Sequence, residues 1–298
     1  MSVALYALFD IGGTAIKYGV SDAEGHFVKN DTVNNPAKEK GIRGMLDVLE
    51  RLLLDMKAEF DICGTGVSTA GVVDAEKGEI LFASDNIPGY TGMKLKSFLE
   101  AAAGIPCVVE NDVNCAGLGE AWLGAGRGAS PLVCITLGTG VGGCVIADGK
   151  LLHGASNFAG EVGYLPMPGG TLEERASTSA LVRRVSDGKG LNVQDIDGKK
   201  VFEWAQNGDR VCLEAIDEML DALAQGVWMT ACVVNPEAFV IGGGISAQKD
   251  FLEPRLREKL SGIMLPHVFE TTRVSFAELG NKAGMLGALR CILNNESV

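Results

Sequence analysis

Three clusters of glycine, each following a buried apolar run, constrain the fold of this chain more than any other feature. Each run is short enough to be a buried β-strand. Glycine permits tight turns and lets the backbone approach a ligand closely. The runs with their clusters are Val3–Phe9 with Gly12 and Gly13, Leu132–Leu137 with residues 138–143, and Ala238–Ile241 with Gly242, Gly243 and Gly244. Three such turns at three strand ends indicate a protein that holds a ligand on its backbone.

Strand-like and helix-like segments alternate along the chain, which indicates an α/β fold. Residues 41–60 carry apolar side chains at the spacing of an amphipathic helix. Further helices are predicted at 113–123, 210–233 and 281–293. The remaining predicted strands are Ala15–Val20, His26–Val28, Ile62–Val67, Pro106–Val109 and Val274–Ala277.

The first two glycine turns belong to a faint internal repeat. Ile11-Gly12 opens one turn and Leu137-Gly138 opens the other, and at the same spacing Asp22 corresponds to Asp148. Each copy reads as strand, glycine turn, strand, turn, strand. Internal copies determine architecture, so we expect two related halves that face a shared cleft.

The composition argues against several functions. Lys and Arg number 26 against 38 Asp and Glu, which gives a net charge of −12. Such a chain repels nucleic acid and anionic membranes, and we expect neither as a partner. The apolar N-terminus lacks the basic start of a signal peptide. The eight cysteines form no C-x-x-C pair and the three histidines are scattered, which predicts reduced thiols in a cytoplasmic protein without a histidine metal cluster.

The first glycine turn suits a magnesium-bound nucleotide. Asp10 stands at a strand end and can hold Mg²⁺ directly or through water. Gly12 and Gly13 let backbone N–H groups approach phosphate, to which the Thr14 hydroxyl can donate, and Lys17 follows. The plain alternative is an ordinary β-hairpin turn.

The second and third clusters extend this nucleotide site. Gly138, Thr139 and Gly140 would form the other side of a phosphate clamp, because a strand rather than a helix follows them. The flat surface of Gly242, Gly243 and Gly244 admits an adenine or ribose ring.

Glu110-Asn111-Asp112 carries the candidate catalytic group. It lies at the carboxyl end of a predicted strand, where α/β sheets bind ligands. Asp112 can accept the proton of an attacking hydroxyl while Asn111 holds another hydroxyl. The alternative is that Asp112 only caps the helix predicted from Val113.

Glu161 and Glu173 belong to a glycine-containing stretch with several polar side chains. Two carboxylates there can accept hydrogen bonds from sugar hydroxyls. The alternative is a solvated loop, which we prefer for Glu174 and Arg175.

These motifs, in this order, resemble those of the ROK family of repressors and sugar kinases. The resemblance covers nearly the whole chain. It implies an actin-like (Hsp70-like) ATPase fold with two α/β domains around a cleft, ATP and Mg²⁺ as cofactors, and phosphorylation of a sugar hydroxyl, usually the 6-hydroxyl. It also implies a homodimer. The motifs are Asp10-Ile-Gly-Gly-Thr-x-x-Lys17, Glu110-Asn-Asp112, Leu137-Gly-Thr-Gly-Val-Gly-Gly143, Ala159-Gly-Glu-Val-Gly163 and Ile241-Gly-Gly-Gly244.

The resemblance assigns roles to single residues. Asp112 matches the catalytic base of the family, and Gly243 matches the adenosine region. The sugar contacts would be Asn86, Asn111, Glu161 and Glu173. The phosphate-turn positions would be Gly12, Thr14, Lys17, Thr139 and Gly140.

One segment departs from the family pattern. Many members have histidine after the Gly-Glu-x-Gly motif and then a C-x-C-G-x-x-G-C zinc segment, whereas Tyr164 and a stretch without cysteine up to Thr171 stand here. A zinc site needs about four N or S ligands, so we expect no zinc. A shorter loop would open the pocket to a larger acceptor such as a β-glucoside. Only nine residues precede Asp10, so we expect no helix-turn-helix domain.

The predicted organisation is an N-terminal α/β domain over residues 1–115 and a C-terminal α/β domain over 116–298, with the last helix able to pack back on the first domain. The predicted activity is transfer of the ATP γ-phosphate to the 6-hydroxyl of a hexose or hexoside, of glucose or β-glucoside type. Alternatives are an N-acetylmannosamine or fructose kinase, a sugar-sensing protein without turnover, and an actin-like or chaperone-like ATPase.

Overall fold

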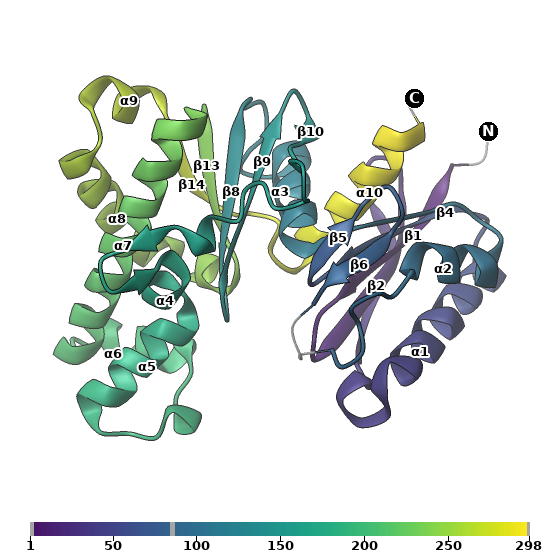
Figure 1. Ribbon diagram of the computed structural model, residues 1–298, viewed down its shortest axis with the longest axis horizontal. Coiled ribbons are helices and arrows are strands. Elements are labelled where there is room, and N and C mark those ends of the chain that lie inside the picture. The colour runs from purple at the N-terminus through teal and green to yellow at the C-terminus, as the bar shows by residue number, and fades with distance from the viewer. Residues whose placement is uncertain (1–2, 84–86, 297–298) are drawn as a thin grey trace. The chain divides into compact units, whose positions relative to one another are not determined.

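The computed structural model describes residues 3–83 and 87–296. These residues pack as two compact units. The N-terminal unit holds the described chain up to Trp122, the segment His153–Phe158 and the described chain from Asn281 onward, and the second unit holds Leu123–Leu152 and Ala159–Gly280. Each unit is built on one five-stranded sheet (Figure 1). The predicted domain boundary after residue 115 stays a prediction.

The sheet of the N-terminal unit has the strand order β3-β2-β1-β4-β7. β1, β2 and β3 pair antiparallel, whereas β4 pairs parallel with both β1 and β7. The five strands predicted for this half are confirmed. β3 is longer than predicted, because its mostly exposed side chains at the sheet edge give no apolar run. The strands are β1 (Leu5–Ile11), β2 (Ala15–Asp22), β3 (Phe27–Asn34), β4 (Ile62–Thr69) and β7 (Cys107–Asn111).

Strand β1 is buried on both of its faces, as its continuous apolar run predicts. Side chains alternate between the faces of a strand. Phe9 therefore packs in a cluster with Leu53 of helix α1 (Ala37–Glu59). Leu8 packs in another cluster with Leu289 of helix α10 (Ala283–Glu296). Helices α1 and α10 thus cover opposite faces of this sheet (Figure 1).

Two further helices and a hairpin complete the N-terminal unit. Helix α2 (Leu95–Ala103) and the hairpin β5 (Val72–Asp74) to β6 (Glu79–Phe82) do not emerge from the sequence patterns. Helix α3 (Asp112–Leu123) follows β7 directly, and it confirms the helix predicted at 113–123.

The sheet of the second unit repeats the first. Its strand order is β10-β9-β8-β13-β14, with the first three strands antiparallel and β13 parallel to both β8 and β14. Position by position this matches β3-β2-β1-β4-β7, so the predicted duplication is confirmed. The strands are β8 (Leu132–Leu137), β9 (Val141–Ala147), β10 (Lys150–Leu151), β13 (Ala238–Gly242) and β14 (Arg273–Phe276).

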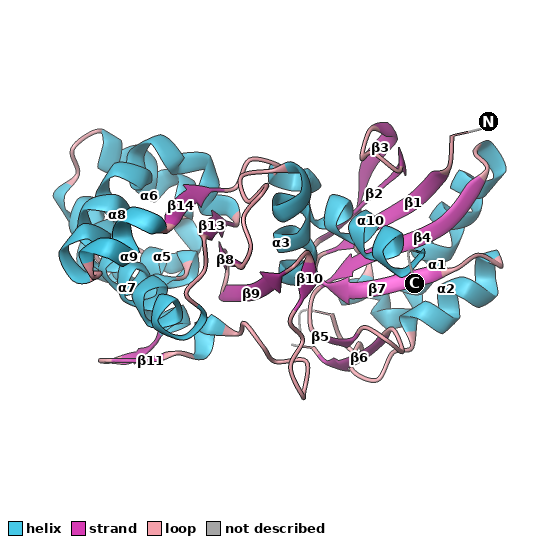
Figure 2. Cartoon of the chain, turned by 90° about the horizontal axis from the view of Figure 1, so that it is seen from above, coloured by secondary structure: helices cyan, strands magenta, loops and turns pink. Residues whose placement is uncertain are grey.

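Helices of the second unit pack beside its sheet in one apolar core (Figure 2). Leu220 and Val227 of helix α7 join Ile135 of β8 and Ile241 of β13 in that core. Helix α7 confirms the predicted helix 210–233, while the other helices of this unit were not predicted. The helices are α4 (Leu172–Ala176), α5 (Thr178–Lys189), α6 (Gly198–Gln206), α7 (Arg210–Val234), α8 (Lys249–Ile263) and α9 (Pro266–Thr271). Among the described residues, no helix combines the length and apolarity needed to span a membrane.

Candidate functional site

Asp10 lies near the end of β1 and is held by partners that the sheet register selects. The antiparallel pairing of β1 with β2 sets Asp10 opposite Lys17, whose Nζ lies 2.8 Å from Asp10 Oδ2. The parallel pairing with β4 sets Asp10 beside Ser68, whose hydroxyl donates to Asp10 Oδ1 over 2.7 Å. Lys17 was predicted at the phosphate turn, and in this structure it pairs with the carboxylate.

Asn35 holds the backbone of the first glycine turn through two hydrogen bonds. The Asn35 side-chain amide donates to the Gly12 carbonyl over 2.8 Å, and its backbone N–H donates to the Thr14 carbonyl over 2.9 Å. Asn35 is buried, whereas Gly12 and Thr14 are exposed. Hydrogen bonds from a buried side chain therefore hold the turn, while its exposed residues can be reached by a phosphate, which suits the predicted role.

Asn111 caps helix α3 and uses its whole hydrogen-bonding capacity in doing so. Its Oδ1 accepts the backbone N–H of Val113 over 2.9 Å and of Asn114 over 3.1 Å. Its Nδ2 donates to the Gly71 carbonyl over 2.8 Å and to Asp112 Oδ1 over 3.1 Å. An amide side chain has two donors and two acceptor positions, so all four are occupied. A direct sugar contact by Asn111 would have to replace one of these bonds.

Asp112 occupies the first position of α3 rather than the position before it. Asn111 takes the capping position that the alternative gave to Asp112, and the catalytic role of Asp112 stays a prediction. Asp112 is half-buried, and its Oδ1 accepts both the Val113 N–H over 3.0 Å and the Asn111 amide. The carboxylate is thus held in a defined orientation at the carboxyl end of β7.

In the second unit, the glycine turn after β8 is held by the helices that follow it. The Gly138 carbonyl accepts the Thr178 N–H over 2.9 Å. The Val141 N–H donates to Glu173 Oε2 over 3.0 Å, and the Glu173 carboxylate packs so tightly on Gly140 that a Cβ there would lie 2.3 Å from Oε2. Glu173 is therefore brought directly to the predicted phosphate turn.

Glu161 lies between two glycines whose backbone packs tightly on the strand that follows the second glycine turn. Gly160 has φ +89°, and a Cβ on it would lie 2.7 Å from Cys144 Cα; a Cβ on Gly163 would lie 2.1 Å from the Val141 carbonyl oxygen. Burial, and then the negative charge of Glu173, raise the pKa of Glu161. Two carboxylates that sense each other beside a glycine turn form a compact set of hydrogen-bond acceptors.

The third glycine cluster lies next to the second. β13 pairs parallel with β8, which sets Gly242 opposite Thr136. Gly243 follows with φ +83°, and a Cβ there would lie 2.2 Å from the Leu137 carbonyl oxygen. Only glycine fits this backbone approach, so Gly243 keeps the third cluster against the end of β8.

The predicted site residues fall into two groups, one in each unit. The structure gathers Asp10 with Lys17 and the first turn in the N-terminal unit, where Asn111 and Asp112 also lie, and it gathers Thr139, Glu161, Glu173 and the other two glycine clusters in the second unit. Asn86 lies outside the described residues.

Sequence reasoning missed three residues that support the site. Ser68 and Asn35 hold Asp10 and the first turn, and His153 pairs with Glu110. Each is remote in sequence from its partner, so no local pattern points to it. The sheet register alone would have identified Ser68.

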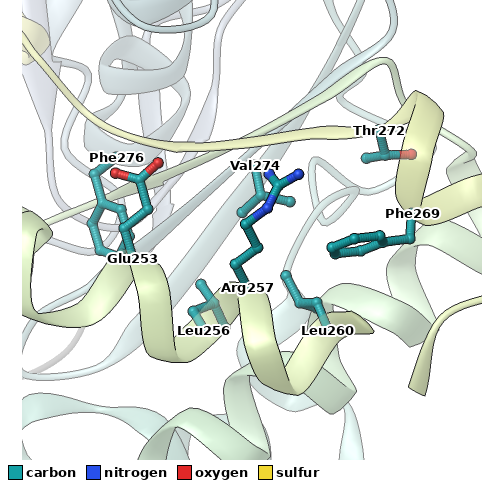
Figure 3. A pocket seen from close by; sticks show the side chains of 8 residues that line it. All are labelled: Glu253, Leu256, Arg257, Leu260, Phe269, Thr272, Val274 and Phe276. Atoms are coloured by element: carbon teal, nitrogen blue, oxygen red, sulfur yellow. The ribbon is translucent and has the colours of Figure 1, made fainter. Parts of the chain in front are cut away.

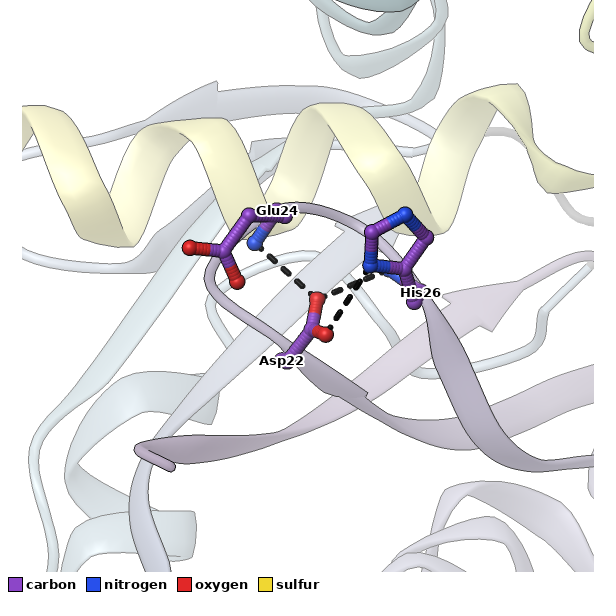
Figure 4. Close-up of side chains that lie close together, drawn as sticks. All are labelled: Asp22, Glu24 and His26. Carbon is purple, nitrogen blue, oxygen red and sulfur yellow. Dashed lines mark hydrogen bonds and ion pairs between the residues drawn. The ribbon is translucent and has the colours of Figure 1, made fainter. Parts of the chain in front are cut away.

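One group of possible metal-ligating atoms stands in an exposed turn between β2 and β3. Among the described residues, only Asp22, Glu24 and His26 meet the distance requirement for three ligands. Asp22 accepts the backbone N–H groups of Glu24 and His26 and contacts the His26 ring nitrogen over 3.0 Å (Figure 4). These bonds are those of a turn closed by an aspartate side chain, and they account for the arrangement.

A small apolar hollow lies between α8, α9 and β14 in the second unit (Figure 3). Its lining includes the apolar side chains of Leu256, Leu260, Phe269, Val274 and Phe276. It contains none of the residues predicted from the motifs.

The duplicated sheet with a glycine turn after the first strand of each half defines a class of protein, the actin-like ATPase fold. The chain belongs to the ROK family, whose model matches residues 6–295. The family and fold predicted from the motifs are therefore confirmed.

Three similar proteins are informative. A glucokinase of Halalkalibacterium halodurans is 33% identical over 313 residues, covering 96% of this chain and 94% of the relative. A beta-glucoside kinase of Listeria monocytogenes is 32% identical over 303 residues, covering 98% of each. The crystal structure of a ROK family glucokinase from Streptomyces griseus in complex with glucose and AMPPNP is 32% identical, with a TM-score of 0.80 and coverage of 97% and 98%.

Proposed function

We propose that the protein is an ATP-dependent kinase that transfers the γ-phosphate to the 6-hydroxyl of a hexose or hexoside of glucose or β-glucoside type. The sugar-kinase class is confirmed by full-length relatives named glucokinase and beta-glucoside kinase. The observation that carries the proposal is the fixed orientation of the Asp112 carboxylate at the end of β7, in the unit that also carries Asp10 and the first glycine turn.

In the proposed reaction, Asp112 accepts the proton of the sugar 6-hydroxyl while that oxygen attacks the γ-phosphorus. The new O–P bond forms as the bond between the γ-phosphorus and the bridging oxygen breaks, and ADP leaves. Phosphoryl transfer depends on positioning and on neutralising charge rather than on covalent catalysis. The bonds that fix Asp112 Oδ1 support this role, because a base must be oriented toward the proton it takes.

Glu161 and Glu173 are proposed to accept hydrogen bonds from the sugar hydroxyls. Their mutual proximity supports this, because burial and the neighbouring charge of Glu173 raise the pKa of Glu161. Hydrogen bonds from sugar hydroxyls would stabilise the charged carboxylate and so oppose this increase. Asn111 is fully engaged in its own hydrogen bonds. We therefore propose that it serves the sugar mainly by holding Asp112.

ATP is supported by the Streptomyces griseus glucokinase, which was crystallised with the nucleotide analogue AMPPNP. The three glycine clusters are proposed to hold its phosphates and adenosine. Asp10 fits a role in holding Mg²⁺, because each of its carboxylate oxygens has one hydrogen-bond partner among the described residues and keeps a lone pair for the ion or its water. When bound, Mg²⁺ would neutralise phosphate charge.

The first test is an ADP-release assay with ATP, Mg²⁺ and a panel of acceptors. The panel contains glucose, mannose, fructose, N-acetylmannosamine, N-acetylglucosamine, cellobiose and an aryl β-glucoside. We expect sugar-dependent ADP release with glucose or a β-glucoside, and its loss when Mg²⁺ is omitted. Preference for cellobiose would support the opened pocket. Well-folded protein that binds a sugar without releasing ADP would contradict the kinase and favour a sugar-sensing protein.

We also infer that the region that carries zinc in many ROK proteins folds here without metal. Hydrogen bonds support this inference. Thr171 and Glu174 form a reciprocal cap at the start of α4, and Arg175 Nη1 donates to the Pro168 carbonyl over 2.7 Å across the hairpin β11 (Pro166–Met167) to β12 (Gly170–Thr171).

Elemental analysis checks the inference about zinc. We expect zinc far below one equivalent per chain and a thermal unfolding midpoint unchanged by EDTA, because protein groups already hold the hairpin. A zinc-bearing ROK protein serves as the positive control. One equivalent of zinc retained through purification would overturn the inference.

A further inference from the structure

We infer that His153 is a positioning residue for the proposed base Asp112 and that it acts through the buried carboxylate of Glu110. The inference rests on the proposed kinase function, because it concerns the same catalytic segment. No sequence motif contains His153, and its connection to the site is visible only in the fold.

Glu110 is the centre of a network that fixes the catalytic segment. It is only 2% exposed. Its Oε1 accepts the backbone N–H of Asn111 over 2.8 Å and the side-chain amide of Asn114 over 2.9 Å. Asn111 in turn donates to Asp112 Oδ1. Any movement of the Glu110 carboxylate would therefore reach Asp112 through one intervening residue.

His153 supplies the charge that this buried carboxylate needs. Its Nε2 lies 2.7 Å from Glu110 Oε2, and its side chain is one third exposed, at 33%. An unpaired buried carboxylate carries a large desolvation cost. Within the described residues, no Lys or Arg pairs with Glu110, so His153, when its ring is protonated, is the cationic partner of this carboxylate.

The pair of His153 and Glu110 also holds the chain segment that leads to Glu161. His153–Phe158 packs with the N-terminal unit, whereas the residues on either side of this segment belong to the second unit. The bond to Glu110 holds the first residue of the segment, and the chain then continues to Glu161. The pair therefore joins the segment that leads to a proposed sugar contact to the strand end that carries the proposed base.

The charge of His153 depends on pH in a defined direction. The hydrogen bond to Glu110 is the main cause that raises the pKa of His153, burial opposes it, and the charges of Glu110 and then Glu76 add to the increase. Among the described residues, these two carboxylates, from β7 and from the turn between β5 and β6, are the charged groups that act on the ring. Because the pKa is raised, the ring of His153 keeps its charge up to a higher pH than a free histidine, and the ion pair with the ionised Glu110 is lost as the pH rises through that pKa.

The test compares pH profiles of kcat for the parent protein and His153→Gln, on the best sugar of the panel. A displacement of reacting groups by about 1 Å can cost roughly 100-fold in rate, so we expect kcat to fall about 10- to 100-fold while the KM for sugar changes little. We also expect the alkaline decline due to His153 to disappear from the profile. His153→Lys, which keeps the cation, should restore part of kcat and move the decline to higher pH.

His267→Gln is the matched control, because His267 is an exposed histidine of α9. It should keep the parent profile. The inference is overturned if His153→Gln folds and retains both the parent kcat and the parent alkaline decline.

A second measurement does not depend on turnover. With three histidines in the chain, the ring protons can be assigned by NMR from the His153→Gln and His267→Gln spectra. We expect His153 to titrate above its ordinary pKa and to return toward it in Glu110→Gln. An ordinary pKa in the parent protein would overturn the pairing. Absence of turnover on every sugar, with the raised pKa observed, would instead count against the proposed kinase function alone.

Discussion

Asp112→Asn is expected to lose most of its turnover while it binds sugar almost as tightly as the parent protein. A positioned general base contributes about 10²- to 10⁴-fold to a rate, and asparagine cannot take up the proton. The side-chain oxygen of asparagine can still accept the bonds from Asn111 and Val113, so the start of α3 should be preserved. Steady-state kcat and calorimetric sugar affinity measure the two effects separately.

Asp55→Asn is the matched control for this experiment, because Asp55 is exposed on α1, away from the catalytic segment. It should leave kcat and sugar affinity unchanged. A turnover of Asp112→Asn within a few-fold of the parent would sink the assignment of the base. A loss of sugar affinity as large as the loss of kcat would show that Asp112 is mainly a sugar ligand.

The central strands of the fold were predictable because each is a short apolar run that no helical pattern overlaps. β1 and β8 are largely continuous apolar runs that end in glycine turns, and the structure buries most of their side chains. The duplication followed from the same turns. β3 was only partly predictable, since an exposed edge strand needs no apolar run.

The elements that were missed depend on packing that no local pattern announces. The short β5–β6 hairpin rests partly on bonds from outside the pair, since the Ile80 N–H donates to the Met93 carbonyl. Helix α8 contains Pro254, a residue that normally argues against a helix interior. Its buried side chains Leu252, Leu256 and Leu260 nevertheless fix it on the second core.

The residues of the candidate site were also predictable only in part. Sequence motifs identify residues that lie within a few positions of one another, such as Asn111 and Asp112. They cannot identify partners that the sheet brings together, such as Ser68 on Asp10 or His153 on Glu110. The role of Asn86, the homodimer and the cytoplasmic location stay predictions, because nothing in the described fold bears on them.

Gly287→Ala is expected to destabilise the N-terminal unit strongly, because helices α3 and α10 touch backbone to backbone. A Cβ on Gly287 would lie 1.7 Å from the Cys115 carbonyl oxygen, and one on Gly119 would lie 2.6 Å from the Ala283 carbonyl oxygen. Backbone cannot rotate aside as a side chain can, so the helices must separate. Overpacking of this kind costs about 3 kcal/mol, which predicts a thermal unfolding midpoint lower by roughly 5 °C or more.

Gly262→Ala is the matched control, since Gly262 lies in α8 and a Cβ there would meet nothing within 4 Å. Alanine is the better helix former by up to about 1 kcal/mol, so this variant should unfold at the parent temperature or slightly above it. An unchanged midpoint for Gly287→Ala would mean that α3 and α10 do not touch as described.

We expect the Gly287→Ala substitution to affect Asp10 as well, because helix α10 also packs against this residue. Gly284, one turn before Gly287, is placed so that a Cβ on it would lie 2.8 Å from Asp10 Oδ1 and 2.9 Å from Ser68 Oγ. Helix α10 therefore begins directly against the carboxylate proposed to hold Mg²⁺. Gly287→Ala that is still folded at low temperature should consequently need more Mg²⁺ for half-maximal turnover, whereas Gly262→Ala should not. If the variant is destabilised but its Mg²⁺ requirement is unchanged, the packing of α10 does not determine the geometry of Asp10, and this part of the prediction is wrong.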